Sequence, residues 1–201
     1  MRINHRAQLA GMAGMAGAVA WAIANIVEYS LGLYPPHGSG PLYVANQILA
    51  FGALASIAVG ILGIAWGGGV RGRFGKIGVW LFALGHVLII LGGIMALFSG
   101  TDDSPIFIVF PIGGLMMDVG ALLTGIAVAA AGHWGGWQRF MPLIYAVYLW
   151  LAIELPSIIG VYADGPGFVP EIFQDVGLFL VALAVYTAQR QTRTLQPNAA
   201  G

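Results

Sequence analysis

Five ionisable side chains that could carry proton or cation chemistry interrupt the apolar stretches of this sequence. They are Glu28, His86, Asp118, Glu154 and Asp175. A carboxyl or imidazole group inside a membrane can bind and release a proton, and such groups often mark ion pathways. Placing a charged residue at the centre of a membrane helix costs roughly 2.5–3.5 kcal/mol. We therefore expect these side chains to face the interior of a helix bundle.

Helical spacing gives two of the acids a neighbour on the same helix face. Asn25 precedes Glu28 by three residues, and Trp150 precedes Glu154 by four, so each pair shares a face. Pro156 follows Glu154 by two residues and has no amide hydrogen to donate. The sequence thus predicts weakened backbone hydrogen bonding around Glu154.

These residues define a candidate site with a centre and an entrance. We predict that the proton- or ligand-binding centre consists of Asp118, Glu154 and His86, and that Glu28, Asn25, Asn46 and Asp175 line an entrance open to the outside. His86 has two interpretations that the sequence leaves open: a proton relay, or a structural hydrogen-bond partner of Asp118 or Glu154. No cofactor and no metal site is predicted.

The elements that must position these residues are apolar segments long enough to cross a bilayer. Apolar residues make up 59% of the 201-residue chain and charged residues only 8%, whereas a soluble domain carries about a quarter charged residues. A spanning helix needs about 20 apolar residues. The sequence predicts a single all-α domain, residues 1–201, with six transmembrane helices at about 8–33, 43–67, 77–98, 107–131, 141–162 and 171–189, and a flexible tail over 190–201.

The positions of the basic residues predict the orientation of this domain. All eight lie near the termini or in alternate loops, at Arg2, Arg6, Arg71, Arg73, Lys76, Arg139, Arg190 and Arg193. Loops that stay in the cytoplasm retain Lys and Arg. We therefore expect a multi-pass protein of the cell (inner) membrane with both termini in the cytoplasm.

An internal similarity suggests that the six helices form three parallel helical-hairpin repeats. The segments that begin at Asp118 and Asp175 both read Asp-Val-Gly and share six of their first eleven residues. A shift of 68 residues also places Arg71 on Arg139 and His86 on Glu154. The alternative is that a chain so rich in Gly, Ala, Leu and Val matches itself by composition alone.

Composition excludes several functions. The chain has no cysteine, so disulfides and thiolate chemistry are excluded. Its only lysine, Lys76, lies in a loop, which excludes a retinal Schiff base in the membrane. No phosphate-binding Gly-rich loop followed by Lys-Ser or Lys-Thr is present. With a formal net charge of zero, a nucleic-acid partner is not expected.

Three functions remain, and the sequence favours the first. It is a proton-linked small transporter or ion pathway, whose ligand is a proton, a cation or a small apolar or lipid molecule. The second is an enzyme that acts on a lipid or isoprenoid by acid–base catalysis, with aromatic walls at Trp21, Trp80 and Trp150. The third is an accessory or assembly subunit of a homo-oligomer or a larger membrane complex, docked through glycine-rich helix faces.

Overall fold

The computed structural model describes residues 4–33, 40–99, 108–161 and 167–194, and every regular element within these ranges is helical. The α-helices are α1 (His5–Leu31), α2 (Gly40–Trp66), α3 (Gly72–Ser99), α4 (Val109–Ala131), α5 (Met141–Tyr148), α6 (Leu155–Ile158) and α7 (Phe168–Thr194). A 3-10 helix, η2 (Gly136–Arg139), precedes α5, and a π-helix, η3 (Leu149–Glu154), joins α5 to α6. Helix α7 thus continues into the predicted tail as far as Thr194, and residues 195–201 lie outside the described part.

Six helical segments are long and apolar enough to cross a membrane, and α5, η3 and α6 together form the fifth over Met141–Ile158. The all-helical class and the number of spans agree with the sequence prediction. The apolar runs account for the helices, because a backbone in lipid must satisfy its hydrogen bonds within each segment. Local signals set some of the ends: the Asn4 side chain caps the start of α1, accepting a hydrogen bond from the Arg6 amide at 3.1 Å.

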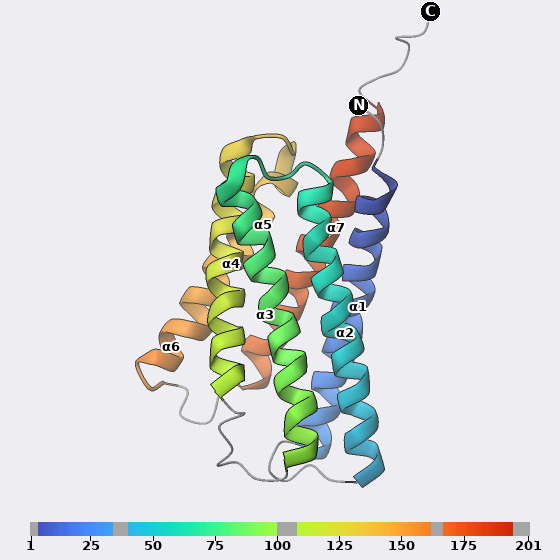
Figure 1. Ribbon diagram of the computed structural model, residues 1–201, viewed down its shortest axis with the longest axis vertical. Coiled ribbons are helices and arrows are strands. Elements are labelled where there is room, and N and C mark those ends of the chain that lie inside the picture. The colour runs from blue at the N-terminus through green and yellow to red at the C-terminus, as the bar shows by residue number, and fades with distance from the viewer. Residues whose placement is uncertain (1–3, 34–39, 100–107, 162–166, 195–201) are drawn as a thin grey trace, which may run out of the picture.

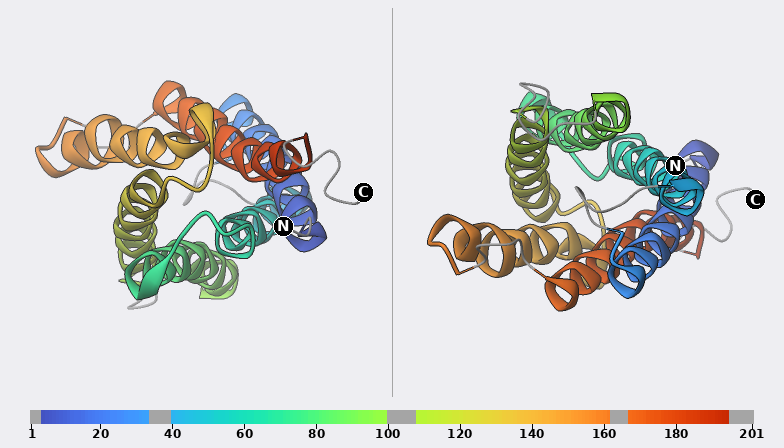
Figure 2. Two further views of the ribbon diagram at one scale, coloured as in Figure 1. Left: turned by 90° about the horizontal axis from the view of Figure 1, so that it is seen from above. Right: turned by 90° about the horizontal axis from the view of Figure 1, so that it is seen from below.

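The helices form a closed ring in chain order. Each of α1 to α4 packs against the next α-helix along the chain, α5 packs against α7, and α7 returns to α1 (Figure 2). The start of α1 and the end of α7 lie at the same end of the bundle (Figure 1). We call this end the basic end, because Arg6, Arg71, Arg73, Lys76 and Arg139 belong to it. The other end is called the opposite end.

Close helix contacts depend on glycine. At Gly60 of α2, an added Cβ atom would lie 2.7 Å from the Cα atom of Gly14 in α1. Gly120 of α4 lies against the backbone of Phe82 in α3, so that a Cβ atom there would collide with the Phe82 amide nitrogen. Small residues permit the van der Waals contact that holds helices together in lipid.

The third helix pair differs from the first two. The α1–α2 and α3–α4 pairs pack along their lengths, whereas α6 leads away from the bundle and α7 packs mainly against α1 (Figure 2). Gly52 and Gly120, which the 68-residue shift would superimpose, have different surroundings, since a Cβ atom at Gly52 would meet nothing within 4 Å. The threefold hairpin repeat therefore stays a prediction.

The outer surface of the bundle is apolar. Large hydrophobic side chains are exposed on every long helix, among them Trp80 of α3, which is 56% exposed. Such a surface fits acyl chains rather than water. The position of Trp80 also corrects one expectation: because it is largely exposed on the outer face of α3, it does not form an interior aromatic wall.

Substitutions at the two glycines test this packing. We expect Gly120→Ala to destabilise the protein by about 1–3 kcal/mol or more, because the α3 and α4 backbones must separate. Gly52→Ala makes the same chemical change in open space and should leave stability unchanged or slightly raised. Thermal unfolding of purified protein in detergent, followed by circular dichroism, compares the two. Equal unfolding temperatures would contradict the close contact at Gly120.

Candidate functional site

The regular α-helical hydrogen bonding of the fifth span is interrupted next to Glu154, and Pro156 accounts for the interruption. A proline ring collides with the carbonyl group four residues before it and provides no amide hydrogen. Over Leu149–Glu154 the chain widens into a π-helix, in which the Leu155 amide donates to the Trp150 carbonyl oxygen five residues earlier. The predicted weakening of the backbone at Glu154 is thus confirmed, and it takes the form of a π-turn, a feature frequent at functional sites.

Asp118 and Glu154 form a carboxyl pair. Asp118 lies on α4, about two and a half turns from the helix start, and is only 1% exposed. Within the described part of the chain, neither of its carboxyl oxygens has a hydrogen-bond donor. The half-buried carboxyl group of Glu154 is its charged neighbour. The Trp150 indole ties the two segments together by donating to the backbone oxygen of Asp118 at 3.4 Å.

A second buried carboxyl group, that of Asp175 on α7, is held by α1. The Asn25 side-chain amide donates to Oδ2 of Asp175 at 3.1 Å, and both residues are at least 95% buried. The other carboxyl oxygen, Oδ1, has no partner among the described residues. This hydrogen bond joins residues 150 positions apart and closes the ring between the first and last helices.

A third acidic pair lies nearer the opposite end. Glu28 of α1 and Glu171 of α7 face each other, and both are half-buried. The Tyr29 hydroxyl lies beside Glu171 as a hydrogen-bonding neighbour, and the charge of Glu28 acts on Tyr43. Since Glu171 is four residues before Asp175 on α7, the two carboxyl groups occupy successive turns of one helix face. Acidic groups therefore lead inward from the opposite end.

Tyr145 is a buried tyrosine on α5, the helix that packs against both α4 and α7. The residue is 1% exposed. The Gln174 side chain lies beside its hydroxyl group as a polar neighbour, whereas Asp118 and Asp175 act on that hydroxyl only through their charges. That hydroxyl makes no hydrogen bond of normal geometry to the described residues. Its ring stacks on Phe82, with centroids 6.0 Å apart and planes 24° apart.

His86 and Asn46 are buried but make bonds other than those expected. The Nδ1 atom of His86 lies 2.9 Å from the Phe82 carbonyl oxygen of its own helix, and Nε2 has no partner among the described residues. The structure thus contains no hydrogen bond from His86 to Asp118 or Glu154. The Asn46 amide donates to the Ala24 carbonyl oxygen at 3.2 Å and so joins α2 to α1.

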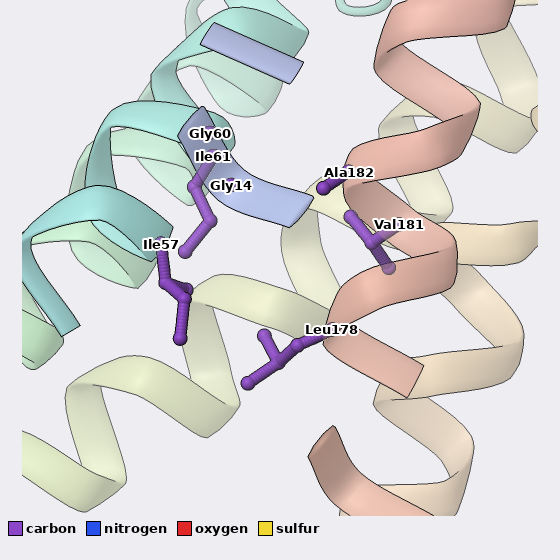
Figure 3. A pocket seen from close by; sticks show the side chains of 7 residues that line it. All are labelled: Gly14, Ile57, Gly60, Ile61, Leu178, Val181 and Ala182. Carbon is purple, nitrogen blue, oxygen red and sulfur yellow. The ribbon is translucent and has the colours of Figure 1, made fainter. Parts of the chain in front are cut away.

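A small apolar cavity lies between α1, α2 and α7 (Figure 3). Its volume of about 10 Å³ is at the lower limit for one water molecule. The lining residues carry only hydrocarbon side chains or none: Gly14, Ile57, Gly60, Ile61, Leu178, Val181 and Ala182. Leu178 is three residues after Asp175, so the interior beside α7 becomes apolar one turn beyond this carboxyl group.

Polar side chains recur at the basic end. The Gln138 amide, on η2, donates to the Thr187 hydroxyl of α7 at 3.4 Å, and the Gln189 amide donates to the Gly67 carbonyl oxygen at 3.1 Å. Gln138 is 2% exposed. Fully buried apolar residues, among them Val128 and Val185, belong to the core between this group and the carboxyl groups.

Among the described residues, the buried carboxyl groups of Asp118 and Asp175 have no positively charged partner. In the sequence, all eight basic residues lie at or beyond the helix ends on the basic side. An unpaired carboxylate in an apolar interior is costly, and binding a proton or a cation removes that cost. Among the described residues, no three His, Asp or Glu side chains are grouped closely enough to hold a metal ion.

Comparison of the chain with protein-family models, with curated proteins and with solved structures finds no match.

Sequence reasoning predicted most of the acidic residues but missed Tyr145. Tyrosines near the membrane surface are ordinary anchors, and Tyr145 lies only four residues after the start of the fifth span. The sequence contained one signal: Tyr145 and Leu149 are four residues apart and share a helix face. If that face is buried, the tyrosine hydroxyl lies inside the bundle.

Removing the amide of Asn25 tests the bond between α1 and α7. We expect Asn25→Leu to lower stability by about 1–3 kcal/mol, because it leaves the second oxygen of Asp175 buried without a partner. The double variant Asn25→Leu/Asp175→Leu should recover much of this loss, since an apolar pair needs no hydrogen bond. Thermal unfolding of the variants in detergent measures both effects. Additive losses would contradict a direct bond.

Proposed function

We propose that this protein is a proton-linked ion pathway or small transporter, in which the Asp118–Glu154 pair binds and releases the proton. One observation carries the proposal: Asp118 is almost completely buried beside another carboxyl group, and among the described residues neither of its oxygens has a donor or a basic partner. Two adjacent carboxyl groups are most stable when they share one proton. Gain or loss of that proton then changes the charge at the centre of the bundle.

The other acidic groups supply an entrance. Glu28 and Glu171 lie toward the opposite end, and Asp175 with Asn25 lies one turn deeper. The distribution of basic residues predicts that the basic end is cytoplasmic. In this orientation protons enter from outside the cell membrane, through Glu28 and Asp175, and reach Asp118 and Glu154. His86 serves as a candidate proton relay in this pathway.

The alternatives lead to different expectations. A lipid or isoprenoid enzyme needs a pocket for an apolar chain, and the apolar cavity beside α7 is far too small for one. An assembly subunit needs its buried acids only for folding or docking. Neither alternative requires that conservative amide substitutions stop proton flux.

Proton flux in proteoliposomes tests the proposal. A potassium–valinomycin potential drives protons inward, and a trapped pH-sensitive dye measures their arrival. We expect flux in the wild type and none in Asp118→Asn or Glu154→Gln, because a side-chain amide, unlike a carboxyl group, does not bind and release a proton at the pH of the assay. Both substitutions keep the size of the side chain, so the variants should fold.

The matched control is Asp103→Asn, the same chemical change between α3 and α4 in the sequence. We expect it to retain wild-type flux. Equal flux in the wild type and in both buried variants would overturn the role of the pair. If the wild type gave no flux above empty liposomes, a proton pathway would be excluded under these conditions, and coupled transport would require assays with added substrates.

A further inference from the structure

We infer that the beginning of α3 and the outer face of this helix form a binding site for an anionic phospholipid. The site combines three exposed basic side chains, those of Arg71, Arg73 and Lys76, with exposed apolar side chains that follow them along α3. It lies on the outside of the bundle, so the inference does not depend on the proposed proton pathway.

The three basic side chains have no acidic neighbour on the segments around them. Arg71 ends the loop between α2 and α3, and Arg73 and Lys76 belong to the beginning of α3. The sequence contains no Asp or Glu over residues 66–99, nor over residues 119–153, which include the other loop at the basic end. Three positive charges in so short a segment repel one another, and a phosphate group relieves that repulsion.

The loop between α2 and α3 is held in place by contacts within the protein. The Gln189 amide donates to the carbonyl oxygen of Gly67 at 3.1 Å. The Trp134 ring covers Gly69, where a Cβ atom would lie 2.6 Å from Cζ2 of the ring. Val70 is buried, with 6% exposure. The basic side chains that follow therefore extend from a fixed backbone, which lowers the entropy lost when an anion binds.

An apolar stripe continues from the basic side chains on one face of α3, which runs from the basic end toward the opposite end (Figure 1). The residues that follow Arg73 at intervals of four and three positions, the spacing of one helix face, are Ile77, Trp80, Leu84 and Val87. We call these four residues the apolar stripe, and each is at least 40% exposed.

The length of the apolar stripe matches one leaflet of a bilayer. The helix rises about 16 Å from Arg73 to Leu84, and one leaflet is about 15 Å deep, half of the hydrocarbon core. A phospholipid whose phosphate group binds Arg73 can therefore place an acyl chain along Ile77, Trp80 and Leu84. The exposed position of Trp80, unsuited to an interior aromatic wall, suits this contact.

Charge favours a lipid over a second copy of the chain as the occupant of this face. Two copies in the same membrane, related by a twofold axis along the membrane normal, would place their α3 helices parallel to each other. The basic side chains at the beginning of α3 would then face those of the other copy, which is unfavourable. An anionic lipid has the complementary charge, and such lipids attract basic residues next to membrane spans.

Two other arginines of the basic end differ from those of the site. Arg139 is engaged within the protein: its Nε atom donates to the Ala129 carbonyl oxygen at 2.6 Å, and its guanidinium group lies over the Phe140 ring, 5.3 Å from the centroid. Arg6 is exposed but belongs to α1, which packs against α2 and α7. Arg6→Gln therefore removes the same charge as Arg73→Gln from the same end of the bundle, outside the site.

Quenching of Trp80 fluorescence by brominated lipids measures binding at the apolar stripe. The protein is reconstituted in phosphatidylcholine bilayers that contain increasing fractions of phosphatidylglycerol with brominated acyl chains. Brominated phosphatidylcholine, which has no net charge, gives the reference. Because the chain has six tryptophans, the signal of Trp80 is the difference between each protein and the same protein with Trp80→Phe.

We expect phosphatidylglycerol to quench Trp80 in the wild type at lower lipid fractions than phosphatidylcholine does. Arg73→Gln should lower the relative association constant for phosphatidylglycerol about fivefold, the contribution of one basic residue at a lipid surface. The triple variant Arg71→Gln/Arg73→Gln/Lys76→Gln should bind the two lipids equally, and Arg6→Gln should keep the wild-type preference. A helical circular dichroism spectrum checks that each variant is folded.

Three results would overturn the site. Equal quenching of Trp80 by the two lipids in the wild type would show that this face does not select an anion. Equal losses in Arg6→Gln and Arg73→Gln would assign the preference to the general charge of the basic end. Disulfide cross-linking between copies of a Leu84→Cys variant, in a chain that otherwise has no cysteine, would show that a second copy covers the apolar stripe.

Discussion

The burial of acidic side chains without a cationic partner is the constraint on which the rest of this structure depends. Asp118 and Asp175 are nearly inaccessible to solvent, and every basic residue of the sequence lies near the helix ends. The interior can hold these groups only if each carboxyl group has a neutral donor, a second carboxyl group or a bound proton. Asp175 has a neutral donor, the Asn25 amide, and Asp118 has a second carboxyl group beside it, that of Glu154.

The packing of the helices makes these solutions available. Glycines allow the backbones of α1 and α2, and of α3 and α4, to pack in direct contact. Close packing leaves the side chains on the inner faces little freedom to move. The fifth span is the exception. Pro156 prevents regular helical bonding there, and the resulting π-turn carries Glu154 and Trp150 toward α4. Regular helices thus hold Asp118, while a locally irregular helix positions its partner Glu154.

Much of this architecture could be predicted from the sequence because it follows from local physical rules. The length of the apolar runs set the number of spans. The cost of charge in lipid directed the acids inward, and the missing amide of Pro156 placed the backbone irregularity at Glu154. The expected role of Trp80 was wrong because an apolar helix gives no indication of which face meets lipid. For the same reason, Tyr145 did not stand out from the tyrosines that anchor helices at membrane surfaces.

The sequence by itself therefore determined the helical class, the six segments long and apolar enough to span a membrane, and the set of acidic residues that interrupt them. Only the tertiary structure decided the pairings: Asp118 with Glu154, Asp175 with Asn25, and His86 with the backbone of its own helix. The physical reason is that the length of an apolar run and the cost of burying a charge are properties of a single segment. The partner of a side chain, by contrast, depends on the order of the helices in the ring and on the rotation of each helix about its axis. That rotation is set by contacts between residues far apart in the chain, such as Gly14 with Gly60 and Gly120 with Phe82.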